Sequence, residues 1–140
     1  MKIGRMLGIM ALCVSSTLAA CGQGGDSGPL TGDVTRGKAA IEVGMCKSCH
    51  ANDLAGSAGP IPGSTVYSSN ITPDDATGIG MWTDQELDNV MRLGKDDSGQ
   101  AVCDPMPVYD TMTAQESADI IAYLRSVPPV NREVAESACR

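Results

Sequence analysis

The sequence predicts a small all-α domain. Two segments carry a threonine, a glutamate three residues later and then apolar residues at helical spacing, which is the pattern of a capped helix. No two alternating apolar runs are separated by a short turn, so no β-hairpin is expected. The 140 residues contain no Phe, one Trp and three Tyr. Since a domain of this size has only a marginal core of its own, something other than aromatic side chains must supply buried apolar bulk.

The first expected helix covers residues 33–45. Val34, Gly37, Ile41 and Gly44 recur within it at helical spacing. A glycine in a helix interior costs about 1 kcal/mol, which is tolerable where another helix must approach closely.

A second helix is expected to follow Trp82. Thr83 and Glu86 form a capping box, and Trp82 with Leu87 has the spacing of a hydrophobic staple. Gly94 is a C-terminal stop signal. The inner stripe of this helix would consist of Leu87, Val90 and Met91.

The last helix is expected to begin after Thr113, whose capping box is completed by Glu116. It would end near Ser126, because the Pro128-Pro129 pair cannot continue a helix. Its apolar residues would be Ile120, Ile121 and Leu124.

Residues 51–82 predict a long irregular loop, because they are rich in Gly, Pro, Ser, Thr and Asn. Such a loop is uncommon in a compact domain, and enclosing a cofactor would explain it.

The segment "MCKSCH" carries the strongest chemical signal. Cys46, Cys49 and His50 form the C-x-x-C-H signature of covalent haem attachment, in which two thiols join the haem and the adjacent imidazole binds the iron. A structural zinc site or a plain disulfide is the alternative, although Cys103 and Cys139 form no second paired motif. A thioredoxin-type redox pair would need a βαβ setting, which the pattern does not show. One covalent haem c is the expected cofactor, and it would supply the missing apolar bulk.

Because His50 is the only histidine, a second haem and a second histidine ligand are both excluded. The sixth position is then left to a methionine, to a weaker donor such as a lysine, or to no residue; a methionine is expected, because a His/Met pair suits electron transfer. Met106 is the leading candidate and Met112 the second, since prolines on both sides of Met106 would present it from a rigid loop. The remaining expectations for methionines are that Met45 is tied to the haem-attachment side and that Met81, Met91 and Met112 pack.

Residues 1–20 predict an export signal, because Lys2 and Arg5 precede a short apolar run that small residues follow. The signal ends in "LAAC", which resembles the lipobox of bacterial lipoproteins, so Cys21 is expected to carry lipid. An ordinary secreted protein with a leftover cysteine is the alternative. Gly22 after the lipidated cysteine favours the outer membrane, on its periplasmic side. The expected organisation continues with a flexible tether at 21–32, the folded domain at 33–130 and a tail at 131–140.

Loss of Lys2 and Arg5 with the signal changes the formal net charge from −7 to −9. This acidity disfavours nucleic acid as a partner. The acids are scattered, which is typical of a solvated surface, and a face that steers a basic partner is the other interpretation.

Cys103 and Cys139 are required by neither the haem nor the lipid. In an oxidising compartment they are expected to form a disulfide, which would tie the tail to the loop that carries Met106. Two unpaired thiols in separate surface segments are the alternative.

Together these motifs resemble class I cytochromes c. The matching order is a first helix, the C-x-x-C-H motif, a Met106-Pro107 loop and a last helix containing "IIAYLRSVPPV". Residues 69–87, "SNITPDDATGIGMWTDQEL", are similar to the corresponding stretch in cytochrome c subunits of periplasmic alcohol and gluconate dehydrogenases. Those subunits carry three haem motifs on a longer chain, whereas this chain has one, so the resemblance does not transfer the dehydrogenase partner.

The resemblance covers about residues 33–130 and implies three or more short helices wrapped around one haem. It also implies that Gly37 meets Tyr123 where the first and last helices cross.

Three contacts near the haem are implied in the same way. Pro60 or Pro62 would offer a backbone carbonyl to the Nδ1–H of His50. Trp82 or Tyr67 would bond a haem propionate, although either aromatic would otherwise simply pack.

We therefore expect a membrane-tethered, monomeric carrier that moves single electrons between exported redox proteins and catalyses no substrate reaction. It would act alone or as a subunit of an oxidoreductase. The alternative is a haem enzyme or a sensor of peroxide or gas with a labile sixth ligand, although no distal histidine is present for acid–base work. A structural lipoprotein without haem is the third possibility.

Overall fold

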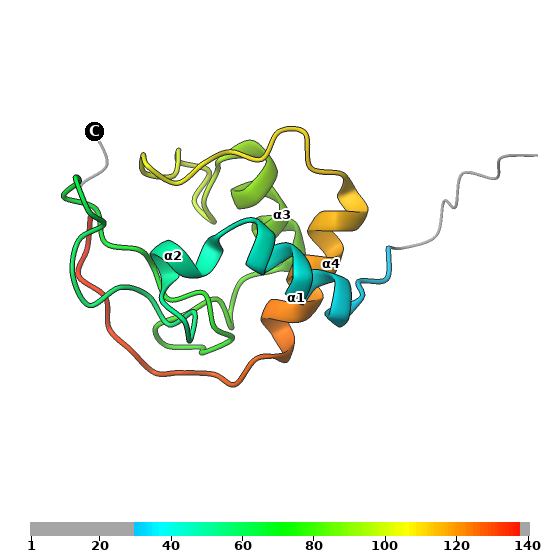
Figure 1. The fold of residues 1–140 in the computed structure, drawn as a ribbon, viewed down its shortest axis with the longest axis horizontal. Coiled ribbons are helices and arrows are strands. Elements are labelled where there is room, and N and C mark those ends of the chain that lie inside the picture. Colours follow the sequence, from blue (N-terminus) through cyan, green and yellow to red (C-terminus); the bar gives the residue numbers. More distant parts are fainter. Residues whose placement is uncertain (1–29, 138–140) are drawn as a thin grey trace, which may run out of the picture.

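The computed structural model describes residues 30–137, which form four helices, the last three of which are joined by long irregular segments (Figure 1). In chain order the helices are α1 (Val34–Val43), α2 (Cys46–His50), α3 (Asp84–Leu93) and α4 (Ala114–Ser126). The described residues contain one further regular feature, an isolated antiparallel bridge between Lys95 and Ala101. The prediction of an all-α domain is confirmed. No helix within residues 30–137 is long and apolar enough to cross a membrane. The predicted signal, Cys21 and Cys139 lie outside the described residues.

The predicted crossing of the first and last helices is confirmed. A Cβ atom built on Gly37 would overlap the backbone carbonyl of Asp119 in α4 and would lie 2.9 Å from the Cβ of Tyr123. Only glycine lets the two backbones approach this closely. Ile41 is buried beside it. Val34, at the start of the same helix, is 45% exposed.

A buried carboxylate fastens the crossing. Asp119 accepts hydrogen bonds from Nε of Arg36 (2.6 Å) and from the backbone N–H of Asp33 (2.8 Å). Nη2 of Arg36 (2.9 Å) and Nε2 of Gln115 (2.8 Å) each donate a further bond to it. The hydrogen-bonded guanidinium of Arg36 is the main reason why the pKa of Asp119 lies far below its usual range. The start of α1 is therefore tied to α4 by a paired charge as well as by packing.

Both predicted capping boxes are present. The Thr83 side chain accepts from the backbone N–H of Glu86, whose carboxylate accepts from the backbone N–H of Thr83. Thr113 and Glu116 repeat this arrangement at the start of α4. Because such boxes involve only residues three apart, their sequence pattern is sufficient to locate the start of a helix.

The end of α3 also follows the prediction, since Gly94 adopts the left-handed conformation with φ of 62°. Leu87 and Met91 of the predicted inner stripe are buried. Val90 is only half-buried, because it lines the large cavity described below instead of the core.

The core is aliphatic, as expected for a chain without Phe. Its buried residues come from three helices and the long loop: Ile41, Leu54, Ile79, Leu87, Met91, Ile120, Ile121 and Leu124. Among the partly buried residues packed against it are Trp82, Tyr109, Met112 and Tyr123. Met91 and Met112 thus pack as predicted. The same prediction for Met81 is wrong, since it is 76% exposed and the adjacent Trp82 makes the core contact.

The segment between α2 and α3 is irregular, as predicted, and the C-terminal tail is bound along it. Nδ2 of Asn70 donates to the carbonyl of Val130 (2.7 Å), whose own N–H donates to Oγ1 of Thr72 (3.1 Å). Further along, Arg132 pairs with Asp53 at 2.6 Å. In Figure 1 the tail accordingly runs from the end of α4 back along the side that this loop forms. The loop is therefore held by side-chain bonds to the tail together with turn hydrogen bonds of its own, such as that from the N–H of Ile71 to the carbonyl of Leu54.

Candidate haem-binding site

A cavity of about 1280 Å³ lies between α1, α2, the loop after α2 and the segment between α3 and α4. It is lined by the four residues that predicted haem binding, Cys46, Cys49, His50 and Met106. Much of the remaining lining is apolar and includes Ile41, Ile71, Ile79, Leu87, Val90, Met91, Ile120 and Leu124. Pockets for drug-sized ligands measure roughly 300–1,000 Å³. The cavity is therefore large enough for a bulky apolar group, and its thiols, imidazole and thioether are the donor groups that covalent haem requires.

The C-x-x-C-H motif forms the short helix α2, which begins after a left-handed turn at Met45 (φ 55°). Residues three and four apart lie on the same face of a helix, and Cys46, Cys49 and His50 accordingly line one cavity. Both cysteines are half-buried free thiols, which argues against a disulfide within the motif. Burial raises the pKa of the Cys46 thiol.

The imidazole of His50 is oriented by one backbone carbonyl. Its Nδ1 lies 2.8 Å from the carbonyl oxygen of Ser69, so Nδ1 carries the proton and the lone pair is on Nε2. Burial lowers the pKa of His50, which favours the neutral form that binds metals.

The expectation that Pro60 or Pro62 supplies this carbonyl is wrong. These prolines belong to a turn that closes on itself through a 2.8 Å bond from the N–H of Ile61 to the carbonyl of Val66. The carbonyl that contacts Nδ1 of His50 is instead that of Ser69, further along the loop. Every residue has a backbone carbonyl, so no sequence signal distinguishes this one.

Met106 is half-buried in the irregular segment between α3 and α4 and lines the cavity. Its N–H donates to the carbonyl of Cys103 (2.9 Å), which closes a turn around Pro105. Met112 lines the cavity too, but it also packs against the hydrophobic core. Among the described residues, Met106 thus lines the cavity without a core contact of the kind that Met112 makes, and its role as sixth ligand stays a prediction.

The two predicted propionate contacts, Trp82 and Tyr67, both line the cavity. The backbone N–H of Tyr67 donates to Oγ of Ser137 in the tail over 2.7 Å. The tail itself forms part of the cavity wall, a role that sequence analysis missed, through Glu133, Val134, Ala135, Glu136 and Ser137. Its composition carries no motif that could have predicted this role.

Cys103 is disulfide-bonded. Its partner is neither Cys46 nor Cys49, since both are free thiols. Pairing with Cys139, which lies outside the described residues, stays a prediction. A disulfide-bonded cysteine has no thiolate to offer zinc, which weakens the alternative of a structural zinc site. Within residues 30–137, no group of three or more His, Cys, Asp or Glu side chains is placed to hold a metal ion.

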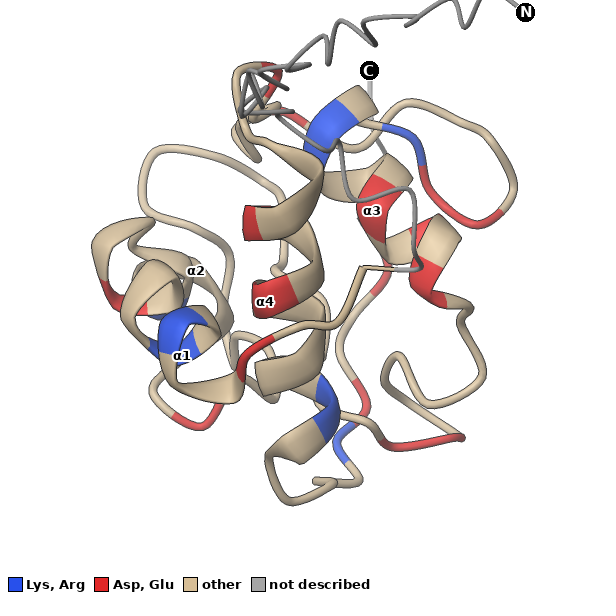
Figure 2. Ribbon diagram, turned by 90° about the vertical axis from the view of Figure 1, so that its right-hand side faces the viewer, with Lys and Arg blue, Asp and Glu red and all other residues tan. Residues whose placement is uncertain are grey.

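The carboxylates in the cavity wall are those of Asp96, Glu116, Glu133 and Glu136, and among the described residues no Lys or Arg lines the cavity. Figure 2 shows the same imbalance over the described part of the chain, where acidic segments recur on α3, α4 and the connecting loops and basic segments are sparse.

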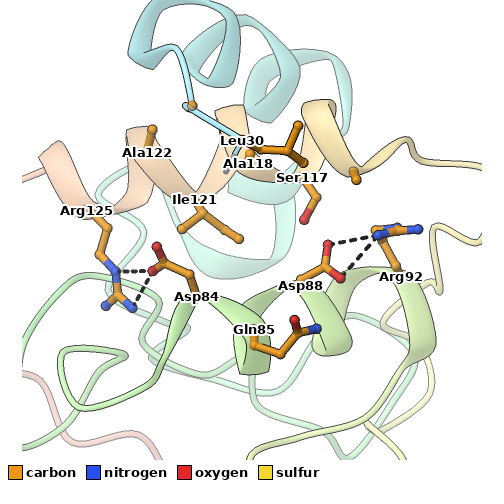
Figure 3. A pocket seen from close by; sticks show the side chains of 12 residues that line it. Leu30, Asp84, Gln85, Asp88, Arg92, Ser117, Ala118, Ile121, Ala122 and Arg125 are labelled. Atoms are coloured by element: carbon orange, nitrogen blue, oxygen red, sulfur yellow. Dashed lines mark hydrogen bonds and ion pairs between the residues drawn. The ribbon is translucent and has the colours of Figure 1, made fainter. Parts of the chain in front are cut away.

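A second cavity, of about 520 Å³, lies between α3 and α4 beneath Leu30 (Figure 3). Its charged side chains are paired with each other, Asp84 with Arg125 at 3.0 Å and Asp88 with Arg92 at 3.2 Å. Of the described residues, no cysteine, histidine or methionine lines it. The donor groups of the predicted cofactor are therefore confined to the larger cavity.

Known proteins resemble this chain over the same region. The sequence pattern of the family described as cytochrome c matches residues 34–128. The chain is 34% identical over 113 residues to one subunit of the nicotinate dehydrogenase of Pseudomonas putida, a match that covers 75% of this chain and 9% of that protein. It is 33% identical over 115 residues to a diheme cytochrome c-type protein of Cereibacter sphaeroides, covering 74% and 39%.

A third relative is the cytochrome c subunit of a quinone alcohol dehydrogenase of Gluconacetobacter polyoxogenes, 34% identical over 105 residues, or 69% of this chain and 22% of that subunit. The chain thus spans less than half the length of each of these relatives. The family match ends at residue 128, so the tail that closes one side of the cavity lies beyond it.

Proposed function

This chain belongs to the cytochrome c family, and from that premise we propose that it is a monohaem electron carrier tethered to the periplasmic side of a bacterial membrane. Haem c, which this family binds covalently, supplies an iron that changes reversibly between the ferrous and ferric states. The chain's own residues would attach the group, orient the ligands and shield the iron from water.

The observation that carries this proposal is that one cavity brings together two free thiols, a neutral imidazole and a thioether. We assign Cys46 and Cys49 to the covalent attachment and His50 and Met106 to the iron. Ser69 would hold the imidazole through Nδ1, which leaves Nε2 for the metal.

A single haem is proposed because the chain contains one C-x-x-C-H motif and one histidine. The diheme relative does not argue against this, since the matched part is only 39% of its length. Trp82 and Tyr67 are proposed as propionate contacts because both line the cavity.

The proposed location in the cell is inferred from the N-terminal residues of the sequence. Residues 1–20 have the pattern of an export signal, and Cys21 ends a lipobox-like "LAAC". We propose lipid attachment at Cys21, with Gly22 favouring the outer membrane.

The partners are proposed from chemistry and from the relatives. Several relatives are cytochrome subunits of alcohol, gluconate and fructose dehydrogenases. We propose that this chain takes electrons from an exported oxidoreductase and passes them to another redox protein, as a monomer that catalyses no substrate reaction itself.

The direct test is to express the full chain with the cytochrome c maturation machinery and to measure its intact mass after denaturation. The mass should include one haem, and the reduced protein should show the pyridine spectrum of a thioether-linked haem. A colourless protein with the mass of the bare polypeptide would indicate a structural lipoprotein instead. Binding of carbon monoxide by the ferrous form at neutral pH would favour the sensor or enzyme alternative over the carrier.

A further inference from the structure

The segment that carries Met106 contains no helix, so other contacts must set its position. Downstream of Met106, the first backbone hydrogen bond to the rest of the fold is made by Tyr109. Its N–H donates to the carbonyl of Met91 near the end of α3 over 2.8 Å. Its hydroxyl reaches in another direction and donates to the carbonyl of Gly44 over 3.3 Å.

Gly44 has a particular place in the chain. It caps the C-terminal end of α1 and stands two residues before Cys46, the first attachment cysteine. The Tyr109 side chain therefore spans from the loop of the methionine to the segment that anchors the haem. These two segments are 65 residues apart in sequence at this contact.

The surroundings of Tyr109 shelter this link. The side chain is half-buried, packs against the hydrophobic core and lines the large cavity. Burial raises the pKa of Tyr109, so its hydroxyl stays protonated at neutral pH and able to donate. Its own carbonyl accepts from the N–H of Met112 (3.0 Å), which orders the chain that leads into α4.

We propose that Tyr109 is a positioning residue, which holds the Met106 loop against the haem-attachment segment through its hydroxyl so that the thioether stays on the iron. This inference rests on the proposed function, which assigns Met106 to the iron. Packing of the aromatic ring alone is the competing explanation, and the two differ in what removal of the hydroxyl does.

The test uses Tyr109→Phe in the full-length holoprotein, because phenylalanine keeps the ring and loses only the bond to Gly44. Imidazole added to the ferric protein must displace Met106, so its apparent affinity reports how readily the loop opens. We expect this affinity to rise about two- to fivefold, the lower part of the range for one net hydrogen bond, because 3.3 Å is long for an O–H···O bond. The reduction potential should fall in parallel, since methionine ligation favours the ferrous state.

The matched control is Tyr123→Phe. Tyr123 is also partly buried against the core, but its hydroxyl has no hydrogen bond within residues 30–137. The control should leave both the imidazole affinity and the potential unchanged. Equal effects of the two variants would show that the loss of any tyrosine hydroxyl loosens the haem pocket, and would overturn the proposal.

Repeating the measurement in a Met106→Ala variant distinguishes positioning of the Met106 thioether from a general loosening of the haem pocket. In a Met106→Ala protein no thioether remains to be displaced, so Tyr109→Phe should no longer change the imidazole affinity. An equal rise in both backgrounds, or no rise with Met106 present, would contradict the role of Tyr109 while leaving the function intact. If Met106→Ala itself does not alter the spectrum, the assignment of Met106 is wrong and this inference fails with it.

Discussion

At the scale of single residues, the site depends on groups whose chemistry is set by one or two neighbours. The carbonyl of Ser69 decides which nitrogen of His50 carries the proton, and burial keeps the ring neutral. Met106, the proposed sixth ligand, lies in a turn closed by the carbonyl of Cys103, and Tyr109 nearby bonds to the carbonyls of Met91 and Gly44. Changes at these positions should therefore alter the electronic state of the haem more than the stability of the fold.

Replacing Met106 with His tests the assignment of the sixth ligand. The iron should remain six-coordinate and low-spin, and the potential should fall by about 0.1–0.3 V, a part of the ~0.8 V range that axial ligands span. Spectroelectrochemical titration measures both. The control is Met112→Leu, which should keep the potential of the parent protein. If instead the Met106 variant is unchanged and the Met112 variant is shifted, the ligand is Met112.

Asp119 predicts a pH dependence of stability. Its pKa is depressed in the folded state, so its contribution is complete above the unfolded pKa of about 3.9 and is lost as the pH falls further. Asp119→Asn should lower the free energy of unfolding by about 1.5–3 kcal/mol at pH 7, because the bonds to a charged acceptor are weakened. The difference from the parent protein should shrink below about pH 4.

Urea unfolding at pH 7 and pH 3, followed by far-UV circular dichroism, measures this difference. Asp75→Asn serves as the control, since Asp75 is exposed and has no hydrogen bond or ion pair within the described residues. A penalty for Asp119→Asn that is the same at both pH values would exclude the carboxylate charge as its source.

At the scale of elements, the three longer helices are specified twice, once by capping at their N-terminal ends and once by the packing of their buried residues. The capping boxes of α3 and α4 are local and match their sequence patterns. The place where α1 rests on α4 is decided by the missing side chain of Gly37. Helix propensity and packing make opposite demands there, and packing prevails.

Gly37→Ala separates these two demands. In an isolated helix alanine would be favoured by about 1 kcal/mol. In the folded protein its Cβ would overlap the backbone of Asp119, so we expect the protein to lose about 1–3 kcal/mol of stability. Val43→Ala, at a strongly exposed position of the same helix, should have almost no effect. Thermal unfolding of both variants measures these differences in stability. A Gly37→Ala protein as stable as its parent would mean that α1 and α4 can move apart freely.

At the scale of the whole molecule, the excess of acids should govern encounters with redox partners. Five cations within residues 30–137 are already held in ion pairs, Arg36, Lys47, Arg92, Arg125 and Arg132. By contrast, Asp104 and Asp110 flank Met106 in sequence, are exposed and form no such pair among the described residues. Uncompensated charge on this loop would attract a basic surface.

Stopped-flow oxidation of the ferrous holoprotein tests this. A cationic small-molecule oxidant should react several-fold more slowly as salt is raised from about 0.01 to 0.5 M, whereas an anionic oxidant should react faster. Asp104→Asn should weaken the salt dependence more than Asp75→Asn, which removes an equal charge from a different loop. The same salt dependence in both variants would attribute the effect to net charge alone.

Several features of the fold and site could be predicted because they depend on neighbours in sequence. The two capping boxes, the stop at Gly94 and the C-x-x-C-H motif need only residues a few positions apart. The incorrect predictions share the opposite property. The exposure of Met81, and the use of the Ser69 carbonyl in place of the predicted one of Pro60 or Pro62, depend on which distant segment lies beside each residue.

By itself, then, the sequence determined the three longer helices and the C-x-x-C-H motif, because the spacing of residues is a property of the chain alone. Only the tertiary structure decided that the carbonyl of Ser69 orients the imidazole of His50 and that the hydroxyl of Tyr109 bonds to the carbonyl of Gly44. It also decided that the C-terminal tail forms part of the cavity wall. These contacts join residues far apart in the chain, two of them through backbone carbonyls. A backbone carbonyl is the same at every position, so only the folded path of the chain selects which one is used.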